Sequence, residues 1–215
     1  MRVEALETRN PKPETSISSK NKFNSCGFIF NFVSKSTPVY KYHDQLTSER
    51  LVTRFLTLED IPIWEEFFED EEAVEFLSLH LLGLKSNLEI STHMIEKQLA
   101  RYAENRFGLQ ALINKSTNEF IGICGLLAQE IDGISEIEVG YHILKKHWKQ
   151  GYATEAAKIF INYAFENDLT SSVVSVIDVD NFKSRRVAEK NGLKIDKQTK
   201  WLDDEDVYIY RITNN

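Results

Sequence analysis

Residues 134–165 constrain the fold more than any other part of this 215-residue chain. Apolar and polar side chains alternate over 134–144, as expected of a strand with one buried face. A basic loop follows, and then small and apolar side chains recur at helical spacing over 153–165, which predicts an amphipathic helix that packs on a sheet. A β-branched run at 173–179 predicts a further strand, buried on both faces. Together these segments predict a strand–helix–strand unit inside an α/β domain.

The remaining segments fit the same kind of domain. Helices are expected over 61–70, where Pro62 stands near the start, over 88–104, and over 184–191, where Gly192 suits the left-handed position that ends a helix. Strands are expected at 51–55, 107–113, 119–127, 194–201 and 207–212, with the second and third joined as a hairpin. The predicted fold class is α/β, or α+β, with a mixed central sheet flanked by helices.

Amino-acid composition excludes some classes of protein and indicates how the chain is divided into domains. The 42% hydrophobic content excludes a chain that is disordered throughout, and only two cysteines exclude a disulfide scaffold. Residues 1–45 are rich in Ser, Lys, Asn and Thr without periodicity, so we predict a mobile N-terminal extension at 1–45 and one domain at 46–215. The alternation of Phe28, Phe30 and Phe32 leaves a strand or a docking segment open there. Cys124 is expected to be buried in a strand.

Net charge and hydropathy limit the classes of partner that the protein is expected to bind. The formal charge is −7, which excludes a surface built to coat nucleic acid, so no nucleic-acid partner is expected. No apolar run is long enough to span a bilayer, so no membrane partner is expected, and two unpaired cysteines agree with a cytoplasmic location. The basic extension keeps one alternative open, an RNA- or ribosome-associated factor. A monomer and a homodimer both remain open.

The loop between the strand and the amphipathic helix favours anion binding. It contains Lys145, Lys146, Lys149 and Gly151, and it leads into a helix N-terminus, where unpaired amide groups and the helix dipole favour negative charge. Gly151 allows a phosphate to approach the backbone closely. The loop lacks the spacing of a Walker A motif and of a dinucleotide-binding G-x-G-x-x-G motif. A loop of solvated lysines with a purely steric glycine is the competing interpretation.

Three motifs in order resemble one family. The strand EIEVGYHI with the turn WKQGYATEA, the later segment NFKSRRVAEKNGL, and the opening segment LTSERLVTRFLTLEDI are similar to the GNAT superfamily of acetyl-CoA-dependent N-acetyltransferases. The most similar branch contains the ribosomal-protein alanine N-acetyltransferases, and the resemblance spans about residues 46–212. It implies a central sheet splayed between two strands, acetyl-CoA as co-substrate, no metal, and a primary amine such as a protein N-terminus or a small molecule as acceptor.

The resemblance also implies a cofactor site. The turn at 148–154 corresponds to the family's pyrophosphate-binding loop, although Lys149 stands where this branch commonly has glycine. The family's splayed strand would offer unpaired backbone groups to the pantetheine arm, and a residue after the next strand would contact the same arm. The cofactor-binding residues expected in this sequence are Tyr141, His142, Ile143, Trp148, Lys149, Gln150, Gly151, Tyr152, Ala153, Thr154 and Asn181.

The chemistry indicates which catalytic groups to expect. An amine attacks a thioester only when it is neutral, so a carboxylate that accepts its proton is useful, and the oxyanion of the tetrahedral intermediate needs a donor such as a free backbone N–H. Glu138 is the expected base, with His142 as a substitute, and a structural ion pair or substrate binding is an equal alternative for Glu138. Ser184 is interpreted first as a helix N-cap and second as a catalytic hydroxyl. By resemblance, many relatives use a tyrosine in the last helix as the acid, and this chain has none there.

Two further observations leave alternatives open. Six acidic residues lie within 65–72, and they are interpreted as a solvated helix face or, by resemblance, as a surface that attracts a cationic acceptor. The departure at Lys149 and the missing tyrosine keep open a non-catalytic CoA-binding or protein-interaction module on the same fold.

Overall fold

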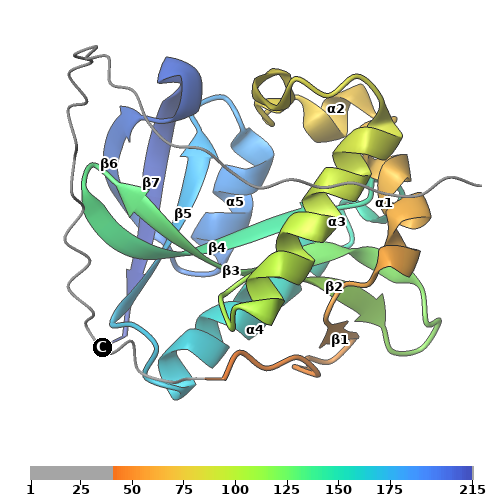
Figure 1. Ribbon diagram of the computed structural model, residues 1–215. Coiled ribbons are helices and arrows are strands. Elements are labelled where there is room, and N and C mark those ends of the chain that lie inside the picture. Colours follow the sequence, from red (N-terminus) through yellow and green to blue (C-terminus); the bar gives the residue numbers. More distant parts are fainter. Residues whose placement is uncertain (1–40, 215) are drawn as a thin grey trace, which may run out of the picture. The chain divides into compact units, whose positions relative to one another are not determined.

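A seven-stranded sheet forms the centre of the protein, whose computed structural model describes residues 41–214 (Figure 1). The strand expected around Phe28, Phe30 and Phe32 therefore lies outside the described residues. The strand order in the sheet is β1 (Leu51–Arg54), β2 (Leu109–Asn114), β3 (Phe120–Ile131), β4 (Ile134–Ile143), β5 (Ser172–Asp178), β7 (Asp206–Thr213) and β6 (Lys194–Lys200). Neighbouring strands are antiparallel except β4 and β5, which are parallel.

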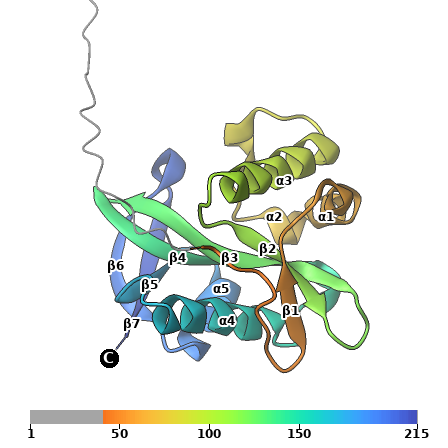
Figure 2. The ribbon, with the colours of Figure 1, turned by 60° about the horizontal axis from the view of Figure 1, so that its bottom comes forward.

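Helices cover both faces of the sheet. Helices α1 (Ile61–Phe68) and α3 (Asn87–Ala103) lie on one face, and α4 (Tyr152–Glu166) and α5 (Phe182–Lys190) lie on the other (Figure 2). The first face is filled by Trp64, Phe67 and Ile95, and the α4 face is filled by Ala156 and Phe160 among others. The predicted mixed sheet between helices is confirmed. The one-turn helix α2 (Glu71–Val74) was not predicted, because four residues are too few for periodicity to show.

The parallel pair β4 and β5 is joined at one place only. Glu138 is paired with Val174, and no other residues of these two strands are in register with each other. Beyond this point β4 stays paired with β3 through Ile143 and β5 stays paired with β7 through Asp178, so the two halves of the sheet separate from each other. The sheet is therefore splayed between β4 and β5, as expected from the resemblance.

The ordered domain begins before residue 46. Tyr42 is only 4% exposed, its hydroxyl donates to the Gly108 carbonyl at 2.7 Å, and it accepts from the Leu126 amide at 3.3 Å. Residues 41–45, which were assigned to the mobile extension, therefore belong to the packed domain. A single buried aromatic residue, Tyr42, anchors this short segment, and a single residue gives no periodic signal in the sequence.

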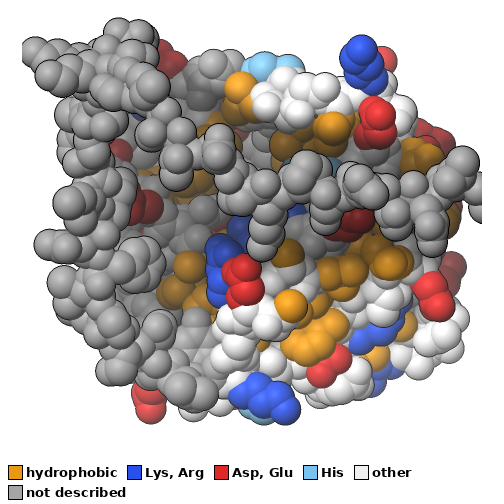
Figure 3. All heavy atoms as spheres, viewed as in Figure 1, with side chains coloured by type: hydrophobic (Ala, Val, Ile, Leu, Met, Phe, Trp, Pro, Cys, Tyr) orange, Lys and Arg blue, Asp and Glu red, His pale blue; other side chains and the backbone are white. Residues whose placement is uncertain are grey.

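The burial of Cys124, the length of the helices and the distribution of surface charge can each be read from the described residues. Cys124 is fully buried in β3, as predicted. No helix within 41–214 is long and apolar enough to cross a membrane. On the visible part of the face that carries α3, basic and acidic side chains are interspersed with apolar ones (Figure 3).

Candidate active site

Side chains bridge the gap between β4 and β5 close to the point where the strands separate. The Ser175 hydroxyl of β5 donates to the Val139 carbonyl of β4 at 3.2 Å. In the opposite direction, the amide of Val176 in β5 donates to the Glu138 carboxylate of β4 at 3.3 Å. These two bonds take the place of ladder hydrogen bonds that the diverging backbones no longer make. Farther along, β4 presents the backbone of residues 140–143 to a gap rather than to a paired strand.

Glu138 is a buried carboxylate at this point of divergence. It is 8% exposed and accepts a second hydrogen bond, at 2.7 Å, from the side-chain amide of Gln129. Burial raises the pKa of Glu138, and the two hydrogen bonds and the positive charge of Arg101 only partly oppose this effect. A carboxylate with a raised pKa is a better proton acceptor than an exposed one. The same contacts also give Glu138 a structural role.

The side chains of Tyr141 and His142, which are adjacent on β4, point to opposite faces of the sheet. The ring of His142 lies on the α1 face, with its centroid 5.7 Å from that of Phe67, and burial lowers the pKa of His142 to about 4. His142 is therefore neutral and weakly basic at pH 7, which argues against its use as the substitute base. Tyr141 lies on the α5 face, where its hydroxyl donates to the Ser184 carbonyl at 3.0 Å. Burial raises the pKa of Tyr141, so the phenol stays protonated.

The loop before α4 contains two residues in left-handed conformations. Lys149 has a φ of 61°, and Gly151, the N-cap of α4, has a φ of 86°. A side chain costs about 1–2 kcal/mol in the left-handed helical region, whereas glycine adopts it freely. This explains why glycine suits position 149 in the resembling branch. Among the described residues, no acceptor takes the amide hydrogens of Tyr152, Ala153 and Thr154, the first turn of α4.

Arg50, just before β1, anchors this loop. Its side chain donates to the Gln150 carbonyl at 3.0 Å, forms an ion pair with Glu155 at 2.6 Å, and lies 4.3 Å from the ring centroid of Tyr152. Glu155 also accepts from the amide of Arg50 and from the hydroxyl of Ser48. Sequence reasoning missed this anchor, because the two residues are about a hundred positions apart and the motifs that contain them do not show that they pair.

Several predicted cofactor residues use their side chains to build the loop. The indole of Trp148 donates to the Ile143 carbonyl at 2.7 Å, so one of the backbone groups expected to face the pantetheine arm already has a partner. The Gln150 amide donates to the Lys146 carbonyl, and the Tyr152 hydroxyl accepts from Asn114 in the interior. The loop therefore offers mainly its backbone, together with Lys149, to a ligand.

Asn181, rather than Ser184, caps helix α5. The Asn181 side chain accepts from the Ser184 amide at 3.0 Å, and the helix begins at Phe182, two residues earlier than predicted. The N-cap interpretation of Ser184 is thus wrong, because its amide is the group being capped. Tyr141 nevertheless brings β4 against Ser184, so residues from both sides of the gap meet here.

The acidic run at 65–72 is partly engaged with lysines around the loop. Lys146 pairs with Glu66 at 2.9 Å, and Lys145 pairs with Asp70 at 3.0 Å. Glu72 accepts hydrogen bonds from both Lys145 and Lys183. These three carboxylates are still 31–50% exposed, as a solvated face would be, and they also join the α1–α2 segment to the residues that follow β4 and begin α5. Sequence separations of 73 to 111 residues hid these partners.

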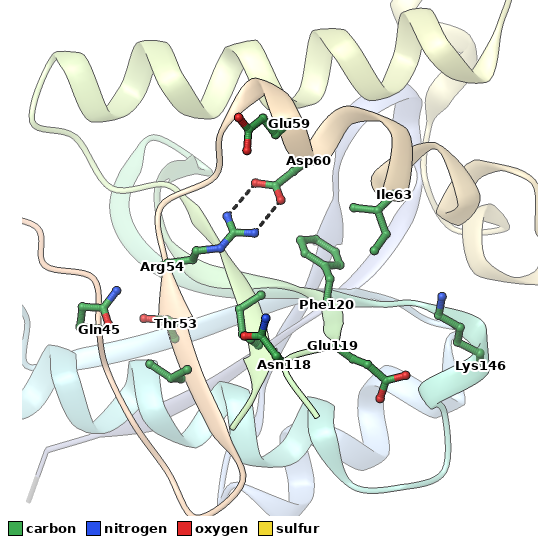
Figure 4. A pocket seen from close by; sticks show the side chains of 12 residues that line it. Gln45, Thr53, Arg54, Glu59, Asp60, Ile63, Asn118, Glu119, Phe120 and Lys146 are labelled. Carbon is green, nitrogen blue, oxygen red and sulfur yellow. Dashed lines mark hydrogen bonds and ion pairs between the residues drawn. The ribbon is translucent and has the colours of Figure 1, made fainter. Parts of the chain in front are cut away.

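A hollow of about 580 Å³ lies beside β1 and α1, apart from the gap between β4 and β5 (Figure 4). Arg54 and Asp60 form a bidentate ion pair across it, at 2.8 and 2.7 Å. Its other charged side chains are Glu59, Glu119 and Lys146, and Lys146 is paired with Glu66. None of the sequence-predicted site residues lines this hollow, so the candidate active site remains the gap between β4 and β5 with the adjoining loop.

Comparison with known proteins connects this geometry to a family. A family model described as an acetyltransferase (GNAT) domain matches residues 50–194. The YkkB protein of Bacillus subtilis (strain 168) is 38% identical over 101 residues, which cover 46% of this chain and 59% of that protein. The uncharacterized N-acetyltransferase p20 of Bacillus licheniformis is 27% identical over 177 residues, which cover 79% of this chain and 96% of that protein.

A solved structure supports the fold independently. RimL, described as a ribosomal L7/L12 α-N-protein acetyltransferase and solved in complex with coenzyme A, superposes with a TM-score of 0.64. The superposition covers 80% of this chain and 98% of RimL, at 15% sequence identity. At that identity, the likeness concerns the fold alone.

Proposed function

The chain belongs to the GNAT acetyltransferase family, and from that premise we propose that it transfers an acetyl group from acetyl-CoA to a primary amine by direct attack in a ternary complex. The observation that carries the proposal is the gap between β4 and β5, which opens beside a loop with left-handed residues and the N-terminus of α4. A protein N-terminus and a small-molecule amine are both acceptors that this proposal allows.

The residues present fit such a ligand. The first-turn amides of α4, with Lys149 beside them, suit a pyrophosphate, because they combine free donors, the positive end of a helix dipole and a lysine. The unpaired edge of β4 at Tyr141 and His142 suits the amide groups of a pantetheine arm, which add to a strand edge as a further strand would. Acetyl-CoA, when bound, supplies the acyl thioester. Asn181 and Tyr141 hold the start of α5 against the far side of the same gap.

We assign the acceptor side to the face of β4 that carries Glu138 and His142. Glu138 there accepts the proton that an ammonium must lose before it attacks, directly or through water, and its raised pKa suits this role. A free backbone N–H of β4 donates to the oxygen that becomes negative during attack. The thiolate that leaves takes its proton from water or from the Ser184 hydroxyl, since residues 188–191, before Gly192, include no tyrosine.

Binding of acetyl-CoA and release of free thiol are the measurements that test this proposal. Acetyl-CoA at about a hundredfold excess over its dissociation constant should stabilise the folded protein by roughly 2.7 kcal/mol, seen as a higher unfolding temperature. Lys149→Glu should reduce the shift, because it places a negative charge beside the phosphates. Lys158→Glu, an exposed charge reversal farther along α4, is the matched control and should keep the full shift.

The outcomes separate this proposal from its alternative. Thiol release on addition of a primary amine supports an enzyme. A full thermal shift without thiol release from any amine in a panel that includes peptides with free N-termini would instead support the non-catalytic CoA-binding module. No shift at millimolar acetyl-CoA would overturn both.

A further inference from the structure

Two lysines meet at the mouth of the gap, one from each of its sides. Lys145 follows β4 by two residues, and Lys183 lies in the first turn of α5, which follows β5. Their ammonium nitrogens lie 4.8 and 4.7 Å from the ring centroid of the same side chain, Trp148. An aromatic ring attracts cations to its face, so Trp148 gathers both positive charges at one place.

The carboxylate that holds these lysines together comes from a distant segment. One oxygen of Glu72, on α2, accepts from Lys145 and the other accepts from Lys183. We call this arrangement the Glu72 bridge. Hydrogen bonds from Lys145 and then Lys183 lower the pKa of Glu72 to about 2, so the bridge is ionised at neutral pH. All three side chains are between 39% and 55% exposed, so an anion from solution can reach them.

Glu72 carries a single charge that is shared between two ammonium groups. Asp70, the second carboxylate, contacts Lys145 only, so Lys183 has Glu72 alone as its carboxylate partner among the described residues. A phosphomonoester carries between one and two negative charges at pH 7 and has three strong acceptor oxygens, so it can satisfy both lysines at once. Trp148, which the lysines flank, begins the loop to which a pyrophosphate is assigned above.

On the basis of the proposed function, we propose that Lys145 and Lys183 bind the phosphomonoester of an acyl-CoA, and that Glu72 is the internal carboxylate which this phosphate displaces. Glu72 thus competes with the ligand for the same two lysines. Removal of its charge strengthens binding of ligands that carry the monoester and leaves ligands that lack it unaffected.

Calorimetric titration with two ligands that differ by one phosphate tests this inference without an activity assay. Coenzyme A carries the monoester, whereas 3′-dephospho-coenzyme A lacks it and keeps the pyrophosphate and the pantetheine arm. At low ionic strength, Glu72→Gln should lower the dissociation constant for coenzyme A about three- to tenfold, the combined effect of two exposed ion pairs. The constant for 3′-dephospho-coenzyme A should change less than twofold. Lys183→Gln should weaken binding of coenzyme A only.

Glu71→Gln is the matched control, because it removes one negative charge from the neighbouring exposed position of the same helix. An equal effect of Glu71→Gln and Glu72→Gln would overturn the inference, as would an equal gain for both ligands in Glu72→Gln. If both ligands bind the wild-type protein and neither Lys183→Gln nor Glu72→Gln changes the dissociation constants, the inference is rejected and the proposed function stands. Failure of the wild-type protein to bind either ligand would reject the proposed function, and this inference with it.

Discussion

At the scale of single residues, Lys149 stands out because it combines a chemical advantage with a conformational cost. Its φ of 61° lies in the region that favours glycine, two residues before Gly151 in the same region. Its ammonium adds a charge to the loop assigned to phosphates. A residue that strains the backbone where a charge is useful is typical of binding sites, where the surrounding structure holds the strained conformation. Here Arg50 holds it from the neighbouring segment.

Replacement of Lys149 by glycine should stabilise the folded protein. Relief of the left-handed strain exceeds the entropy that glycine adds to the unfolded chain, so we expect the free energy of unfolding in urea to rise by about 0.5–1 kcal/mol. Lys149→Ala is the control, because it removes the charge and the long side chain but keeps the Cβ atom. An alanine variant as stable as the glycine variant would show that the backbone is not strained.

At the scale of elements, Glu138 connects β4 and β5 at the point where these strands separate. The β5 amide of Val176 and the amide of Gln129 both donate to this carboxylate. Its pKa is raised by burial, so the folded state holds the proton more tightly than the unfolded state does. As pH rises above the ordinary value of 4.5, the unfolded chain loses this proton first and stability falls, until the pH passes the raised pKa.

Glu138→Gln should remove this pH dependence. The glutamine variant should gain stability relative to the wild-type protein as pH rises from about 4.5 toward neutrality, measured by urea unfolding at several pH values. If Glu138 is also the base, the rate of acetyl transfer should fall by about 10²–10⁴-fold at neutral pH while acetyl-CoA still binds. Glu130→Gln, on an exposed position of β3, should change neither quantity. Stability curves that stay parallel across this range would contradict the assignment of the raised pKa.

Helices and strands were largely predictable, whereas the contacts between them were not. Alternation over 134–144 and the small-residue stripe over 153–165 predicted β4 and α4 to within one residue, because long periodic segments report which face is buried. The splay was expected only from the resemblance. The Glu72 bridge and the Arg50 anchor join charged residues that are far apart in sequence. The sequence around a charged residue does not identify the residue with which it pairs. Helix α2 is too short for periodicity.

At the scale of the whole molecule, Tyr42 ties the start of the described chain to the centre of the sheet. Its hydroxyl links the Gly108 carbonyl, just before β2, to the Leu126 amide in β3. Its ring packs edge-on to Phe107, at a centroid distance of 5.3 Å. The segment at 41–45 therefore contributes to the stability of the whole domain, although it forms no strand of the main sheet.

Tyr42→Phe should destabilise the protein by about 1–3 kcal/mol, because it leaves a buried amide and a buried carbonyl without their partner. Urea unfolding of the full chain measures this change. Tyr208→Phe is the control, since the Tyr208 hydroxyl makes no hydrogen bond within residues 41–214, and it should change stability little. Equal stability of the Tyr42→Phe and wild-type proteins would show that the hydroxyl does not anchor the segment.

The outermost strand on the β7 side has a consequence for how copies of the protein meet. Within residues 41–214, strand β6 pairs with β7 alone, and it carries Lys194, Lys197 and Lys200 within seven residues. Lysines along an open edge repel a second edge of the same kind and keep water around the unpaired backbone groups. Growth of a continuous sheet from one copy to the next is thus disfavoured at this edge, which protects the protein against aggregation when it is concentrated.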